Sequence, residues 1–229
     1  MADKPPRVIS RRDLLTGATL TGIAATTGFP SVATAQGAAA TQTSEAYEHL
    51  TTEEATLLEA IADELIPPDE HGPGAIEARA VHYIDRALGG ALSGSLDDYR
   101  SGLAALDRYC RQSRGVPFTE LSPADRISVL VNVETGTATG FAESSSAFFS
   151  KVRRHVLEGT FGDPYYGGNH NFIGWDLLGY PGVRTAVTPD AQQRLEGNEL
   201  RPSRRSAYDW ETFTKASARL SRRDPQHGN

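Results

Sequence analysis

The sequence predicts an all-α protein: an irregular bundle of about five helices, followed by a long, loop-rich and extended C-terminal arm. Three observations predict this class. Apolar residues recur at positions i, i+3, i+4 and i+7 in five stretches, as they do on the buried face of a helix. Helix caps, glycines and prolines bound these stretches. No stretch alternates as a half-buried strand does, and the one β-branched run, residues 127–133, follows a helix cap.

The first two helices have clear boundaries. Thr51 to Glu54 form a capping box, and the pair Pro67–Pro68 ends the helix that begins there. We expect the second helix from about Ala75 to Leu88, with Gly89 and Gly90 after it and with Ile76, Ala80, Ile84, Ala87 and Leu88 buried.

Ser95 caps the third helix, which ends at Gly115. The fourth helix begins at Ser122 and ends before Gly136. The fifth helix runs from about Ser145 to Glu158. Cys110 lies on the packed face of the third helix, as an inert buried thiol or as half of an interchain disulfide. We expect one face of the fourth to carry Ile127, Leu130, Val131 and Glu134, and one face of the fifth to carry Phe148, Phe149, Val152, Val156 and Leu157.

The C-terminal part has a different composition. Residues 159–169 are rich in glycine and aromatic residues, and residues 183–206 are polar with few core residues. Trp210 and Phe213 would share one side of a short helix near the end. Such a tail either lies on a partner as an arm or packs back on its own domain.

The N-terminus predicts an export signal of the twin-arginine (Tat) type. Arg11 and Arg12 precede Leu14 and Leu15 and a modestly apolar run, and a small-x-small cleavage pattern comprises Ala33 and Ala35 before Gln36. We therefore expect a signal peptide at 1–35, a flexible linker at 36–49, a helical domain at 50–182 and a polar partner-docking tail at 183–229. The expected location is the periplasm, and the Tat translocase is an expected partner.

Composition narrows the function classes. The chain has 23 Lys and Arg against 29 Asp and Glu, a net charge of −6, and loss of the signal would leave the mature chain at −8. Nucleic acid is therefore not an expected partner, because phosphate binding depends on Lys and Arg. The single cysteine excludes an internal disulfide, a cysteine-ligated cluster and a haem c attachment motif.

The sequence offers no motif for a catalytic, cofactor or metal site, and we expect none in this chain. It lacks Glu-x-x-His pairs for di-iron, a Gly-x-Ser-x-Gly elbow and the common nucleotide-binding glycine motifs. Asp69, Glu70 and His71 cluster in a turn-like loop, where a solvated turn is the simpler interpretation than a metal site. His82 resembles an edge residue, and His170 lies in the aromatic loop, where a contact role fits better than catalysis.

Two blocks of sequence resemble the gluconate 2-dehydrogenase subunit 3 family, the small subunits of membrane-associated flavin dehydrogenases. The first block is Leu50–Pro67 with Gly72–Ala75 and Tyr83–Asp85. The second, more specific block is Leu157–Asn169, which contains Asp-Pro-Tyr-Tyr-Gly-Gly-Asn, followed by Gly174-Trp175 and Gly179–Gly182.

The resemblance implies a non-catalytic small subunit that escorts, exports and stabilises a large dehydrogenase subunit, which would hold FAD and oxidise a sugar or sugar acid. A cytochrome c subunit is a possible further partner, and membrane contact would be only indirect. Glycines would let loop 159–169 fold tightly while its aromatic side chains offer rigid contact area. We expect Phe161 inside and at least one tyrosine outside, and a partner surface comprising Phe161, Asp163, Tyr165, Tyr166, Asn169, Trp175, Trp210 and Phe213.

Two other functions remain open from the sequence. An independent periplasmic enzyme would use His71, His82, His155 or His170 with acidic residues at an unrecognised site. A sugar-binding module would use Tyr165, Tyr166 and Trp175 as stacking platforms.

Overall fold

The computed structural model describes residues 46–184, 186–200 and 202–211. The residues predicted for the export signal and its cleavage site lie outside these ranges, and so does Phe213. The described residues contain seven α-helices and no strand, so the predicted all-α class is confirmed while the helix count is about seven rather than five. The helices are α1 (Thr52–Leu65), α2 (Ala80–Leu88), α3 (Leu96–Arg114), α4 (Pro123–Glu134), α5 (Ser145–Phe161), α6 (Ile173–Leu178) and α7 (Pro189–Glu196).

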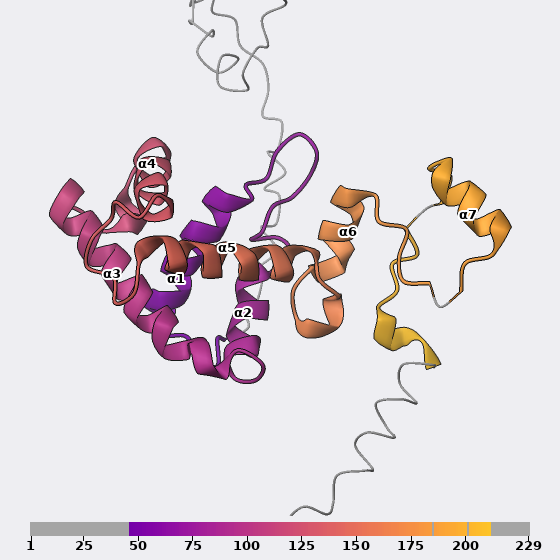
Figure 1. The fold of residues 1–229 in the computed structure, drawn as a ribbon, viewed down its shortest axis with the longest axis horizontal. Coiled ribbons are helices and arrows are strands. Elements are labelled where there is room, and N and C mark those ends of the chain that lie inside the picture. Colours follow the sequence, from indigo (N-terminus) through magenta and orange to yellow (C-terminus); the bar gives the residue numbers. More distant parts are fainter. Residues whose placement is uncertain (1–45, 185, 201, 212–229) are drawn as a thin grey trace, which may run out of the picture. The chain divides into compact units, whose positions relative to one another are not determined.

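Helix α5 is the centre of the bundle and contacts α1, α2, α3, α4 and α6 (Figure 1). Its buried residues include Phe148, Val152 and Val156, as the sequence predicts. They join a single apolar core to which α1 contributes Leu58 and Ile61. Because each of the helices α1 to α5 contributes buried residues to this core, hydrophobic burial fixes the body of the protein.

The expected capping residues open the helices where the sequence places them. The Thr51 hydroxyl accepts from the Glu54 amide, and the Glu54 carboxylate accepts from the Thr51 amide, which completes the capping box of α1. Ser122 caps α4 by accepting from the Asp125 amide. Each such cap satisfies an amide that the first helical turn leaves without a partner.

The second helix begins later than expected. Residues 75–79 form turns, and α2 begins only at Ala80, after Arg79 in a left-handed conformation (φ 56°). Ile76 lies in these turns and is 37% exposed instead of buried. The start of this segment is instead bound to the end of α1: the Ala75 amide donates to the Ile66 carbonyl at 2.9 Å, and Gly74 packs closely against the backbone of residues 66–68.

Two expected helix faces also differ. In α4 the buried residues are Val129, Leu130 and Val133, while Ile127, Val131 and Glu134 are exposed. In α5, Leu157 is 38% exposed, and the helix continues through Gly159 to Phe161. Gly159 lies inside the helix at a packing position, where a Cβ would lie 2.7 Å from the carbonyl oxygen of Ala80 in α2.

Candidate functional site

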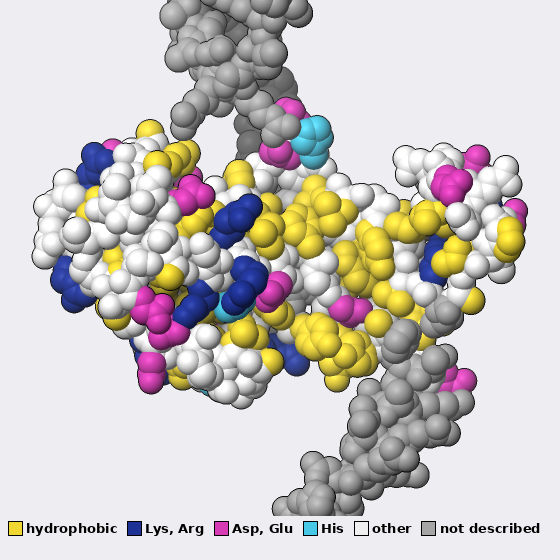
Figure 2. All heavy atoms as spheres, in the orientation of Figure 1, with side chains coloured by type: hydrophobic (Ala, Val, Ile, Leu, Met, Phe, Trp, Pro, Cys, Tyr) yellow, Lys and Arg dark blue, Asp and Glu magenta, His cyan; other side chains and the backbone are white. Residues whose placement is uncertain are grey.

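The strongest candidate site is the loop between α5 and α6, residues 162–172, which contains two 3-10 turns, η3 (Pro164–Tyr166) and η4 (His170–Phe172). Hydrophobic side chains gather on the molecular surface over this loop (Figure 2). It is the glycine-rich and aromatic segment from which the sequence predicts partner contacts.

Asn169 closes the loop from within. It is fully buried and left-handed (φ 44°), a conformation that Asn tolerates better than most residues. Its side-chain nitrogen donates to the Gly162 carbonyl at 2.7 Å, and its side-chain oxygen accepts from the Gly174 amide at 2.8 Å. Its backbone amide donates to the Gly159 carbonyl at 2.7 Å. Asn169, which we expected to face a partner, therefore ties the two ends of the loop together.

A close backbone approach adds to this constraint. Gly168 lies directly against Gly159 of α5, so that a Cβ on Gly168 would collide with the Gly159 carbonyl oxygen. Only a residue without a side chain fits here. The loop thus docks on the end of α5 through backbone contact.

Trp175 also lies inside the chain. Its side chain is 6% exposed, and its indole nitrogen donates to the Phe161 carbonyl at 2.9 Å. The rings of Phe172 and Tyr180 lie 5.4 and 4.9 Å from it. Phe161 itself is partly buried. The indole therefore supports the loop instead of offering a sugar-stacking platform.

The two tyrosines of η3 point outward. Tyr165 is 56% and Tyr166 48% exposed, and their rings meet edge to face at 5.4 Å. A hydrogen bond to the Tyr208 hydroxyl raises the pKa of Tyr166 to about 12, so this phenol stays protonated at neutral pH. Both rings lie outside, as the sequence predicts for at least one tyrosine of this loop.

Asp163 and Trp210 make contacts within this chain. The Asp163 carboxylate accepts from the Tyr165 amide and also from Ser206 and Ala207 of the C-terminal region. The guanidinium of Arg205 lies over the Trp210 ring, 4.4 Å from its centroid. Ser206 and Ala207 therefore contact the loop of their own chain, while the contact of Trp210 lies within the C-terminal region itself.

Sequence reasoning missed two groups of residues here. Ser206 and Tyr208 were not predicted to contact the loop, although Ser206-Ala-Tyr-Asp209 has the spacing of a capping box that opens the 3-10 turn η5 (Ala207–Asp209). The role of Asp85 was also missed: its buried carboxylate accepts from the amides of residues 48, 49 and 50 at 2.8 to 2.9 Å. Asp85 of α2 thus holds residues 48–50 in place.

The histidines of the described residues do not gather at one place: His82 and His170 line the same polar cavity, whereas His155 and His71 lie elsewhere. His155 is buried in α5, its Nδ1 lies 2.9 Å from the Tyr99 hydroxyl, and burial lowers its pKa. His71 lies in the exposed loop after α1, near Glu70, and the ring of His82 lies against that of Tyr47. Within the described residues, no three His, Cys, Asp or Glu side chains are grouped to hold a metal ion.

Cys110 is a buried free thiol, and burial raises its pKa to about 11. A thiol with such a pKa is a poor nucleophile at neutral pH. The interpretation of an inert buried residue fits this position in the described chain.

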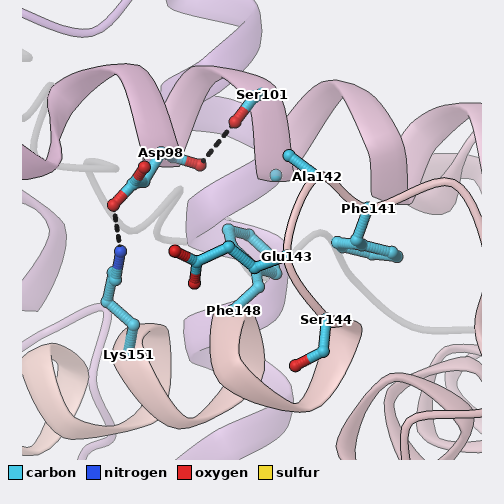
Figure 3. Close-up of a pocket in the computed structure, with 9 residues that line it drawn as sticks. Asp98, Ser101, Phe141, Ala142, Glu143, Ser144, Phe148 and Lys151 are labelled. Carbon is cyan, nitrogen blue, oxygen red and sulfur yellow. Dashed lines mark hydrogen bonds and ion pairs between the residues drawn. The ribbon is translucent and has the colours of Figure 1, made fainter.

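Three hollows in the described residues differ in size and in lining. A pocket of about 30 Å³ between α3 and α5 has room for about one water molecule and carries the ion pair of Asp98 and Lys151 (Figure 3). A groove of about 480 Å³ lies along α1 and α3, beside Glu54 and Arg100. A polar cavity of about 410 Å³ lies between α2 and the loop, where Arg86 and His170 line it.

Among the helices of the described residues, none has the length and apolar character needed to cross a bilayer.

Comparisons with known proteins agree with the two sequence blocks. A family model described as gluconate 2-dehydrogenase subunit 3 matches residues 52–182, which include the helical body and the loop. No curated protein and no solved structure matches the chain.

Proposed function

Because the chain belongs to the gluconate 2-dehydrogenase subunit 3 family, we propose that it is the non-catalytic small subunit that escorts and stabilises the large subunit of a flavin-dependent dehydrogenase. The family implies association with a larger dehydrogenase complex. In the proposal, the partner holds FAD and oxidises a sugar or sugar acid, and a cytochrome c subunit can complete the complex.

The observation that carries the proposal is the construction of the loop. Buried polar contacts of Asn169 and the close approach of Gly168 hold its backbone, while Tyr165 and Tyr166 remain about half exposed. Rigid, exposed tyrosines are typical of interface hot spots, because they bury much area at a small cost in side-chain entropy. A loop that is fixed before association loses little further entropy on binding.

Export through the Tat route, with the partner carried along, is the second part of the proposal. Its support is the pattern of Arg11 and Arg12 before an apolar run, with Ala33 and Ala35 at the expected cleavage point. The proposed location is the periplasm, with membrane contact only through the complex.

Co-purification tests the first part. A tag on this chain should recover a larger flavin-containing protein from the native host, with flavin absorbance in the complex and none on the small subunit alone. Replacing Tyr165 and Tyr166 together by Ser should reduce recovery at least tenfold, since truncation of a hot-spot residue costs about 2 kcal/mol or more. Val131→Ser on α4 is the matched control, because Val131 is also 48% exposed and lies away from the loop.

Two results would contradict the escort role: recovery of the small subunit alone from host cells, or stoichiometric flavin on the purified single chain. Replacing Arg11 and Arg12 by Lys tests export separately. The large subunit should then stay in the cytoplasm. If it still appeared in the periplasm, the proposal that the small subunit exports the large subunit would be refuted.

A further inference from the structure

Residues 206–208 of the C-terminal region contact the candidate loop, although about 40 positions separate the two segments in the sequence. The contact joins two short turns, η3 in the loop and η5 in the C-terminal region. The turn η3 is capped by Asp163, whose carboxylate accepts from the Tyr165 amide. The turn η5 is capped by Ser206, whose hydroxyl accepts from the Tyr208 amide at 3.0 Å. Each turn therefore has local hydrogen bonds of its own, in addition to the contacts between the two turns.

Asp163 connects the two turns. Its Oδ1 accepts from the Ser206 hydroxyl at 2.6 Å, and its Oδ2 accepts from the Ala207 amide at 2.7 Å. Ser206 is 8% exposed while Asp163 and Ala207 are of intermediate exposure, so these bonds are partly buried. Hydrogen bonds to a carboxylate are the stronger kind, and here both oxygens bind adjacent residues of one segment.

The aromatic contacts lie beside this pair of bonds. The Tyr208 ring stacks on Tyr165 with 3.8 Å between centroids and meets Tyr166 edge to face at 5.8 Å. The hydroxyls of Tyr166 and Tyr208 are 2.6 Å apart. The loop therefore contacts three features of residues 206–208: the Ser206 hydroxyl, the Ala207 amide and the Tyr208 ring.

The rest of the C-terminal region adds little to this attachment. Helix α7 buries no residue, and Arg204 forms an exposed ion pair with Asp176. The Ser203 amide also donates to the Pro181 carbonyl at 3.2 Å. Since exposed ion pairs contribute little, the contacts at Asp163, Tyr165 and Tyr166 supply most of the hold on residues 203–208.

We propose that Asp163, Tyr165 and Tyr166 form a peptide-recognition site for a hydroxyl-x-aromatic turn, and that this chain's own Ser206-Ala207-Tyr208 occupies it as a releasable latch. With the latch in place, about half of each loop tyrosine remains exposed. The inference concerns contacts within one chain and does not depend on the proposed dehydrogenase partner.

Hydrogen exchange of the mature full chain tests the latch. Asp163→Asn keeps the shape of the side chain but removes one acceptor oxygen, so the amides of Ala207 and Tyr208 should exchange at least tenfold faster. Asp176→Asn is the matched control: it weakens only the exposed pair with Arg204 and should change these rates less than about threefold. Equal rates in the two variants, or no acceleration in Asp163→Asn, would overturn the proposal.

Binding in trans tests recognition. A full chain carrying Ser206→Ala and Tyr208→Ala leaves the site open, and a fluorescent peptide of residues 202–211 should bind it with a Kd below about 0.1 mM. A linked segment acts at about millimolar effective concentration, so a Kd in this range lets the chain's own segment compete about tenfold with the peptide. The wild-type chain, with its site occupied, should bind the peptide at least tenfold more weakly, and so should Asp163→Ala added to the open chain.

Absence of saturable binding to the open chain, or equal binding to the open and wild-type chains, would refute the site. Exchange at the Gly174 amide, which Asn169 holds, reports whether the loop stays folded. If the double variant loses this protection, the single variant Tyr208→Ala takes its place, with the same expected order of affinities.

Discussion

The helical body and the C-terminal region are held by different forces. Helix α1 buries five residues and α5 buries eight, whereas α7 buries none. The described C-terminal residues instead hold to the loop by bonds to Asp163 and by stacking of Tyr208 on Tyr165. Apolar burial stabilises a domain cooperatively, while a few polar contacts at one place can open without unfolding the rest. The comparison predicts that equivalent substitutions have unequal effects in the two regions.

The largest difference should follow a core truncation. Phe118 is fully buried in the 3-10 turn η2 (Phe118–Glu120), beneath the guanidinium of Arg126. Phe118→Ala should lower the free energy of unfolding by about 3–5 kcal/mol, because it leaves a cavity in a close-packed core. Leu195→Ala on α7, at a side chain 44% exposed, should change it by less than about 0.5 kcal/mol. Urea titration of the mature chain measures both, and similar losses would show that the two regions unfold as one unit.

The next largest effect should come from the loop that joins the regions. Gly168→Ala places a Cβ against the Gly159 carbonyl, so the backbone must shift, and we expect a loss of about 1–3 kcal/mol with faster exchange at the Asn169 amide. Gly94→Ala is the control, because a Cβ there meets nothing within 4 Å. An unchanged unfolding free energy for Gly168→Ala would contradict the close packing described for this loop.

The sequence predicts the body well because its signals are local. Caps such as Thr51 and Ser122 mark the helix starts, and Cys110 lies on the packed face of α3, as the sequence predicts. The errors occur where tertiary packing overrides the local pattern. Gly159 resembles a helix end, yet it lies within α5 because α2 approaches closely at that point.

The candidate site was predicted only in part for the same reason. Composition distinguishes the exposed tyrosines, but not the inward orientation of Asn169 and Trp175, which depends on bonds to Gly162 and Phe161. Helix α7 was missed because it has no apolar face, although Thr188 before Pro189 is a helix-start signal. The contact of Tyr208 with Tyr165 joins residues 43 positions apart, and no local pattern encodes it.

Buried polar groups provide a third test, through pH. Burial lowers the pKa of His155, Glu158 raises it, and Arg154 and Lys151 lower it further. The unfolded chain therefore binds a proton near pH 6.5 that the folded chain resists. The free energy of unfolding should fall as the pH drops below about 6.5, with a slope of at most about 1.4 kcal/mol per pH unit, and should be independent of this group above that pH.

His155→Gln should remove this slope between pH 7.5 and 5.5, measured by urea titration at each pH, although it will also lower stability at all pH values by disturbing the bond to Tyr99. His71→Gln, in the exposed loop after α1, should keep the wild-type slope. If His155→Gln retained the full slope, the acid sensitivity would belong to groups other than His155.

The smallest expected effect compares two helix caps of the same chemistry. The hydroxyl of Thr51 caps α1 and that of Thr188 caps α7, each accepting a backbone amide at 3.2 Å. Thr51→Ala should lower the free energy of unfolding by about 1 kcal/mol, because α1 is part of the cooperative core. Thr188→Ala should leave that free energy unchanged and only accelerate exchange at the Ala191 amide, because a helix that buries no residue frays without unfolding the body. Because both variants remove the same kind of hydroxyl cap, equal losses of unfolding free energy would mean that α7 is coupled to the core. The C-terminal region would then be attached by more than the contacts at Asp163 and the two loop tyrosines.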